Sequence, residues 1–393
     1  MKVFWIVFYI FFPSIILYLA YKNKILNKIG PFILAYAVGL IIGNTNLINE
    51  EYNELPKLIA TISVPFAIPL LLFSLDIKKI KILGISTILS SLFALIGVIL
   101  AVISGYFIFC KHIPESWKIA GMMVGVYTGG TPNLAALKTA LNVDNDIYIL
   151  THTADTLLGI LMILFFLTIA QKILLFVLPK FPVNKIIKNK KNNDKSISQH
   201  QNNLKIYDDS PQAYLKAFKN YKRLPKLIIA FGLSILIVAV SYGLGQLVAK
   251  NYFEAVVILS ITTLSILASL FSKIRNIKYT FQLGMYLILI FSLSVATLGK
   301  FDKLITGSVY IFYYVAWVIF ISFLIHVLLS AIFRVDADST IIITTAFTMS
   351  PPFVPVIAAA LKNRYIILSG LIVGIIGYAI GNYLGLLIAY YLK

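Results

Sequence analysis

The stretch GVYTGGTPNLAALKTALN, residues Gly125–Asn142, lies between two long apolar segments and interrupts the helix that they would otherwise form. Glycine is conformationally free, and Pro132 lacks an N–H and disfavours helix in the residue before it. We therefore predict that one helix ends near Tyr127 and that another begins at Leu134. The possible function of this break depends on the composition and the motifs of the rest of the chain.

The composition indicates that this break lies in a membrane protein. Of 393 residues, 60% are hydrophobic and 12% are charged, with a mean hydropathy of +0.91, whereas a soluble domain has about 25% charged residues. Apolar runs of roughly 20 residues are long enough to cross a bilayer as helices. The net charge of +19 is typical of lysine in short cytoplasmic loops. We therefore expect the lipid bilayer, and not nucleic acid, as a partner.

Twelve apolar segments follow one another along the chain. They cover residues 3–21, 30–48, 57–76, 83–109, 116–142, 146–178, 225–248, 254–273, 277–298, 304–333, 337–362 and 364–391. The second half also contains a break, in FTMSPPFVPVIAAALK around Pro351-Pro352. The first segment follows Lys2 as in a signal peptide, but no clear small-residue cleavage site follows, so we expect it to be retained as a span.

A polar stretch rich in Lys, Asn and Ser separates two similar halves. The expected parts are a first transmembrane repeat at 1–178, a cytoplasmic linker at 179–224 and a second, inverted transmembrane repeat at 225–393. Within the linker, an amphipathic helix is expected near Ala213 to Phe218. Phe-Ser-Leu begins at Phe73 and at Phe291, 218 positions apart, and the two breaks are about 220 positions apart. Matching features at nearly one spacing indicate an internal repeat.

The lysine-rich loops indicate the orientation, because cytoplasmic loops carry an excess of Lys and Arg. The basic loops Tyr21–Lys28 and Asp76–Lys81 flank the acidic loop Asn49–Lys57, which places the N-terminus outside. Two readings of Gly125–Asn142 stay open, a complete crossing or a re-entrant hairpin, and the hairpin fits the charges better. The expected fold is an all-α polytopic membrane protein with two inverted repeats of five transmembrane helices, each with a broken helix or re-entrant hairpin.

Broken helices expose backbone groups that can bind a ligand. A helix N-terminus attracts an anion, and freed carbonyl groups and hydroxyls suit a bare cation. We expect free amides at Gly130, Thr131 and Asn133. The candidate substrate-binding residues around the two breaks are Thr128, Gly129, Gly130, Thr131, Asn133, Thr348 and Ser350. The alternative is a Pro/Gly kink that only helps packing.

One carboxylate lies well inside an apolar segment. Asp155, in THTADTLLG, costs several kcal/mol at membrane depth unless it is paired, bound to a cation or protonated. Thr151 shares its helical face, Thr156 borders that face, and Asn382 is the nearest polar candidate on the related helix of the second half. We therefore expect Asp155, Thr151, Thr156 and Asn382 to bind Na⁺ or a carried proton. A structural aspartate bonded to a neighbouring helix stays open.

The sequence lacks the residue patterns that common enzymatic and metal-binding sites require. The chain has no metalloprotease, phosphate-binding or nucleophile-elbow motif. Its histidines, His112, His152, His200 and His326, are too dispersed to suggest a metal cluster. The single Cys110 excludes an intramolecular disulfide. We expect that the protein is not an enzyme and uses no cofactor, only Na⁺ or H⁺ as a coupling ion.

Three motifs carry a family resemblance. PFAIPLLLFSLDIKKI, GVYTGGTPN and the aspartate of TADTLLG resemble the YjcL-like family of uncharacterised bacterial and plastid membrane proteins, over most of the chain except the linker. That family is similar in architecture to the glutamate–sodium symporters and, more distantly, to the cation–proton antiporters and bile-acid symporters. The resemblance implies an elevator-like transporter of two inverted repeats. The second break departs from the pattern, because it reads Met-Ser-Pro-Pro where related proteins tend to carry glycines.

The leading expectation is a secondary active transporter in which Na⁺ drives uptake of a small organic anion by alternating access. The alternatives are a cation–proton exchanger, with Asp155 as the carried carboxylate, and a non-transporting membrane protein. The partners expected are a small-molecule or ion substrate and the bilayer, with a bacterial inner membrane as the location. A homodimer is compatible with the sequence.

Overall fold

The computed structural model describes residues 2–45, 54–76, 83–182, 210–219, 223–250, 253–299, 309–349, 351–363 and 365–393. Every regular element in these ranges is a helix. The fold of the described residues is therefore all-α, as the composition predicts.

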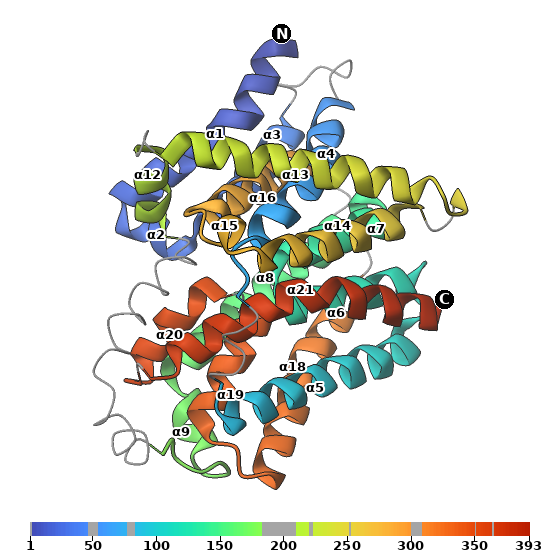
Figure 1. The fold of residues 1–393 in the computed structure, drawn as a ribbon. Coiled ribbons are helices and arrows are strands. Elements are labelled where there is room, and N and C mark those ends of the chain that lie inside the picture. The colour runs from blue at the N-terminus through green and yellow to red at the C-terminus, as the bar shows by residue number, and fades with distance from the viewer. Residues whose placement is uncertain are drawn as a thin grey trace. The chain divides into compact units, whose positions relative to one another are not determined.

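Nine of the described helices are long and apolar enough to cross a membrane. They are α1 (Lys2–Lys22), α4 (Glu54–Leu72), α5 (Ile85–Phe109), α8 (Asn145–Thr168), α13 (Leu224–Gly245), α14 (Phe253–Leu270), α16 (Thr280–Thr297), α18 (Val309–Ile332) and α21 (Ile367–Leu392). Figure 1 labels them along the chain. A shorter apolar helix, α3 (Pro31–Asn44), occupies the position of another predicted span. Together these helices correspond to the ten unbroken apolar segments of the sequence.

The two segments predicted to be broken are indeed divided. The first forms α6 (Ser116–Gly129) and α7 (Thr131–Ala140). The second consists of α19 (Ala337–Thr344), a π-helical turn η5 (Thr345–Met349), a 3₁₀ turn η6 (Pro351–Phe353) and α20 (Val354–Ala360). Prolines inside the second break remove backbone donors, so a regular α-helix cannot continue through it.

Short helices connect the longer ones. They are α2 (Lys24–Ile29), α9 (Ala170–Leu174), α12 (Pro211–Lys219) and α15 (Ser272–Arg275). The helix α12 confirms the amphipathic helix predicted near Ala213, which is buried with Tyr214 while Gln212 is exposed. The central part of the predicted linker, 183–209, lies outside the described residues.

By contacts the chain divides into two compact units. The first unit comprises Met1–Leu75, Ala135–Thr153 and Asp209–Ile311, and the second unit comprises Asp76–Leu134, Ala154–Asp208 and Phe312–Lys393. Each unit thus takes helices from both halves of the sequence. The chain passes from one unit to the other inside three helices, α7, α8 and α18.

In the first unit, α3, α4 and α16 pack at very short range (Figure 1). On α3, Gly39 and Gly43 lie so close to the Leu293 and Thr297 carbonyls of α16 that a Cβ would not fit. At Gly284 of α16, a Cβ would lie 3.0 Å from the Ala67 carbonyl oxygen of α4. Small residues allow this close approach of backbones, as is common between membrane helices.

The second unit contains both helix breaks. Its α21 packs against α6, and its α5 packs against α6 and α19. On α5, Gly97 faces the Ser322 carbonyl of α18, where a Cβ would lie 2.6 Å away. The Tyr314 hydroxyl of α18 donates to the Val102 carbonyl of α5 at 2.9 Å. Close packing therefore fixes the helices that surround the breaks.

Candidate functional site

The first break consists of a single residue, Gly130. Its dihedrals, φ 72° and ψ −163°, lie in a region that is essentially restricted to glycine. The helix α6 ends at Gly129, close to the predicted end near Tyr127. The helix α7 begins at Thr131, so the predicted start at Leu134 was wrong. Because one glycine turns the chain and Pro132 suits the first turn of a helix, no longer unwound stretch is needed.

Two of the amides predicted to be free are hydrogen-bonded. The Gly130 N–H donates to the Val126 carbonyl at 2.7 Å, and the Asn133 N–H donates to the Gly130 carbonyl at 3.1 Å. The Thr128 hydroxyl is also turned back, donating to the Val124 carbonyl at 2.8 Å. In this conformation the break thus offers fewer free groups than the sequence suggested.

The first break is held against α21. The Asn133 side-chain amide donates to the Gly377 carbonyl at 3.1 Å. A Cβ at Gly129 would lie 2.9 Å from the same carbonyl oxygen, and a Cβ at Gly377 would overlap the Thr128 carbonyl oxygen. Thr131 is half-buried at the start of α7. This part of the predicted substrate site is therefore assembled against a helix from the other half of the sequence.

At the second break, the π-helical turn places Thr348 at a small internal cavity. The cavity has a volume of about 10 Å³, which is roughly the space needed for one water molecule. Its lining residues are Ala94, Val98, Tyr127, Ser322, Phe323, His326, Thr344, Phe347 and Thr348. The candidate Ser350 lies outside the described residues. The cavity thus brings residues of both breaks together within the second unit.

The Asp155 side chain lies near the hydroxyl of the fully buried Tyr127. Since Tyr127 also lines the cavity, this tyrosine lies between the predicted cation ligand and the second break. Tyr127 was not among the site residues predicted from the sequence. Its position directly before Thr128 in the interrupted segment was the available signal.

The other predicted cation ligands are divided between the units. Thr156 is half-buried on α8, and Asn382 is fully buried on α21, both in the second unit with Asp155. Thr151, one turn before Asp155 on α8, belongs to the first unit, and its hydroxyl donates to the Ile147 carbonyl at 2.8 Å.

A buried histidine, His326, supports the second break. Its Nε2 lies 2.9 Å from the Ser90 hydroxyl and its Nδ1 lies 2.9 Å from the Thr344 hydroxyl. Because the Thr344 hydroxyl donates to the Thr340 carbonyl at 2.9 Å, its oxygen accepts from Nδ1–H, and Nε2 accepts from Ser90. This arrangement uses the neutral imidazole and ties α5 to α19 through α18.

Two acids at the start of α19 were also missed. The Asp336 carboxylate caps the N-terminus of α19 by accepting from the Ser339 N–H at 2.8 Å. The buried Asp338 carboxylate accepts from the Gln171 amide at 2.7 Å and from the Asn363 amide at 2.9 Å. These bonds tie α9 and the turn after α20 to α19. Nothing in the hydropathy pattern distinguishes these aspartates from loop residues.

An all-α polytopic membrane protein, with a carboxyl group beside a helix break, is the class of protein that these features define. The family model described as "Protein of unknown function (DUF819)" matches residues 8–393. The chain therefore belongs to this family. It is 24% identical over 384 residues to the "Uncharacterized membrane protein YjcL" of Bacillus subtilis (strain 168), an alignment that covers 93% of this chain and 90% of the relative. This agrees with the family resemblance of the sequence motifs, and the protein is an integral membrane protein.

Proposed function

We propose that this protein is a secondary active transporter, and not an enzyme, in which a cation drives uptake of a small organic anion by elevator-like alternating access. The observation that carries the proposal is the position of Asp155, inside a membrane-spanning helix and near the Tyr127 hydroxyl beside the first helix break. An ionisable side chain within a membrane segment usually marks an ion or substrate pathway. The proposed coupling ion is Na⁺, bound by Asp155 with Thr156 and Asn382, in a bacterial inner membrane.

The proposed architecture is a pair of inverted repeats, each with five spans and one re-entrant hairpin. It is supported by the order of the helices, because α4, α5, the first break and α8 recur as α16, α18, the second break and α21. It is also supported by the composition of the two units, each of which contains helices from both halves. Transporters built from inverted repeats carry their discontinuous helices at the repeat interface.

The proposed substrate site is the first break together with Thr348. The helix α7 has its N-terminus at Thr131, and a helix N-terminus favours an anionic group. Because the Asn133 amide is engaged with Gly377, we propose that substrate binding exchanges this hydrogen bond for one to the ligand.

The test compares the cation response of the wild type and of Asp155→Asn. The full chain is purified in detergent, and its thermal stability is measured against NaCl at constant ionic strength, with choline as the replacing cation, and then against pH. Wild-type protein is expected to be stabilised by Na⁺, since a ligand that binds only the folded state raises the melting temperature. The Asp155→Asn variant is expected to fold and to lose this response, while Asp146→Asn in the first turn of α8 keeps it.

The outcomes separate the competing functions. Stabilisation that depends on pH but not on Na⁺ would favour the cation–proton exchanger, with the same Asp155 as carrier. An Asp155→Asn variant that responds to both ions as the wild type does would leave Asp155 with a structural role. In that case the proposed coupling mechanism is wrong.

A further inference from the structure

The first unit contains a second small pocket, formed by α4, α7, α8 and α16. It has a volume of about 20 Å³, enough for one water molecule or one small ion. Its polar lining residues are Lys57, Thr61, Lys138, Thr139 and Asn145. None of these residues belongs to the proposed substrate or cation site. Two lysines at one small pocket form the feature to be explained.

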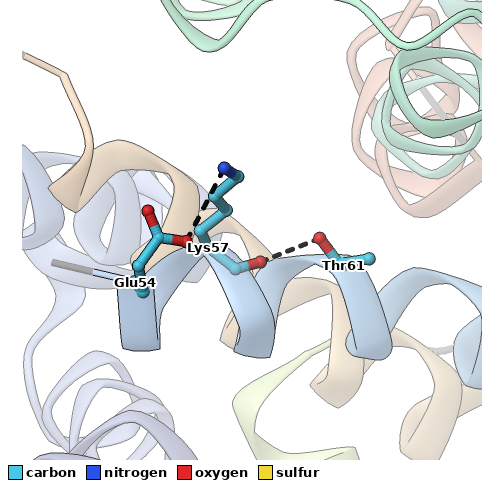
Figure 2. A network of polar contacts seen from close by, with 3 residues as sticks. All are labelled: Glu54, Lys57 and Thr61. Carbon is cyan, nitrogen blue, oxygen red and sulfur yellow. Dashed lines mark hydrogen bonds and ion pairs between the residues drawn. The ribbon is translucent and has the colours of Figure 1, made fainter. Parts of the chain in front are cut away.

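Lys57 is only weakly neutralised. On the first turns of α4, its Nζ lies 3.6 Å from the Glu54 carboxylate, as Figure 2 shows together with the Thr61 hydroxyl that donates to the Lys57 carbonyl at 2.9 Å. The side chains of Lys57 and Glu54 are 58% and 85% exposed, and exposed pairs of this kind contribute little to stability. The Lys57 ammonium therefore keeps donors that can bind a further anion.

Lys138 is less exposed than Lys57, and its charge is not neutralised by an ion pair with any of the described residues. It is half-buried in the last turn of α7, and no carboxylate of the described residues forms an ion pair with it within 4.0 Å. Its Nζ lies 5.9 Å from the centroid of the Tyr148 ring. A lysine in the last turn interacts favourably with the carbonyl end of its helix. That effect accounts for Lys138 alone and does not explain a second lysine at the same pocket.

The surroundings favour an anion over a cation. Two ammonium groups at one pocket repel each other, and a bound negative charge would remove that repulsion. The first turn of the 24-residue helix α8, at Asn145, adds the positive end of a helix dipole. Of the charged groups that act on Lys138, Asp144 attracts its ammonium group and Lys57 repels it. An anion between the two lysines would oppose that repulsion.

We infer that this pocket binds a small monovalent anion, a halide or the carboxylate of a small organic acid, between Lys57 and Lys138. The inference does not depend on transport, since occupancy can be measured on the purified chain. It concerns a site in the first unit, whereas both breaks and Asp155 belong to the second unit.

The experiment holds Na⁺ constant and changes only the anion. The full chain in detergent is titrated with sodium chloride or sodium acetate against sodium gluconate, and the melting temperature is recorded. A saturable rise is expected in at least one titration, and the more effective anion distinguishes a halide from a carboxylate. In Lys57→Gln and Lys138→Gln, the midpoint of the titration is expected to move to at least tenfold higher anion concentration.

Two further variants sharpen the test. Lys118→Gln is the matched control, because Lys118 pairs with Glu115 at 2.7 Å in the same i,i+3 arrangement but does not line the pocket. It is expected to keep the wild-type midpoint. Glu54→Gln removes the partner of Lys57 and is expected to move the midpoint in the opposite direction, to lower anion concentration.

Two results would overturn the anion site. The first is an unsaturable rise or no rise in the wild type. The second is an equal midpoint in Lys57→Gln, Lys138→Gln and Lys118→Gln, which would make the effect one of general salt. If Lys138→Gln does not fold, the exposed Lys57 and Glu54 still decide the question through their opposite shifts. Asp155→Asn is expected to retain the anion response, so failure of the proposed cation coupling would leave this inference standing.

Discussion

Gly130 concentrates the first helix break in one residue. At φ 72° and ψ −163°, a side chain would clash with its own backbone, and such conformations cost about 1–3 kcal/mol for other residues. The next residue already belongs to α7. A change at this position therefore acts on the direction of two helices at once.

The substitution Gly130→Ala is expected to lower the free energy of unfolding by about 1–3 kcal/mol, because alanine is strained in these dihedrals. The measurement is the melting temperature of the purified protein. Gly243→Ala on α13 is the control, since a Cβ there meets no atom within 4 Å and alanine is the better helix former. Equal stability of Gly130→Ala and the wild type would mean that the break does not require glycine.

At the residue scale, the sequence predicts positions better than it predicts contacts. The break at Gly130 and the aspartate in an apolar run were visible because glycine, proline and a carboxylate are locally unusual in a membrane segment. Tyr127 and His326 were not, because a tyrosine or a histidine in an apolar segment gains its role from neighbours far along the chain. The cavity that Tyr127 lines joins residues from Ala94 to Thr348.

The start of α19 depends on a buried cap. Asp336 accepts from the Ser339 N–H, while its other carboxylate oxygen is buried and has no hydrogen-bond partner among the residues that the structure describes. Burial raises the pKa of Asp336, and the bonds to Ser339 offset only part of that rise. At pH values between the unfolded and the folded pKa of Asp336, the folded protein therefore binds more protons than the unfolded chain does.

The sign of the pH effect follows from this raised pKa. Stability is lost as the pH rises from the unfolded pKa of about 3.9 through the folded pKa of Asp336, and the loss persists above it. Asp336→Asn keeps a capping oxygen and carries no charge. We expect its melting temperature to exceed that of the wild type at pH 7 to 8, and the difference to shrink towards acid pH.

A contrasting variant is Asp338→Asn. The Asp338 carboxylate accepts from two amides, and an asparagine would present a donor to one of them. It is expected to be less stable than the wild type at neutral pH. A melting curve in which Asp336→Asn is also the less stable protein at pH 7 to 8 would show that the charged cap is favourable.

Helices could be predicted from the sequence where a single property of the sequence, such as apolar length, determines them. Apolar length gave the long helices, and the amphipathic pattern gave α12. The ends of the broken helices were not predictable to the residue, because they depend on backbone hydrogen bonds such as that from Gly130 to Val126. The π-helical turn was likewise hidden, since it is stabilised by packing and not by a sequence motif.

At the scale of the whole molecule, the composition of the two units bears on the predicted internal repeat. Each unit is built from segments of both halves, which an inverted repeat would produce. The sequence predicted the repeat from matched spacings, but contacts between distant segments do not follow from spacing. Whether the halves have opposite orientations in the membrane stays a prediction of the lysine pattern.

Cysteine labelling tests the orientation. In a Cys110→Ser background, single cysteines are introduced at Ser196, in the lysine-rich linker, or at Asp144, which is exposed before α8. A membrane-impermeant reagent is expected to reach the two positions from opposite sides, because the hairpin model keeps basic loops in the cytoplasm. Labelling of both from one side would mean that Gly125–Asn142 crosses the membrane completely.

The interleaving of the units also constrains how the protein is made. Synthesis proceeds from the N-terminus, yet the first unit requires Asp209–Ile311 and the second requires Phe312–Lys393. When the ribosome has finished α5, the face around Gly97 has no α18 to receive it. The helices that are synthesised first must therefore remain in the bilayer, or bound to an insertase, until the helices that pack against them have left the ribosome. Neither unit can therefore be completed before most of the chain has been synthesised.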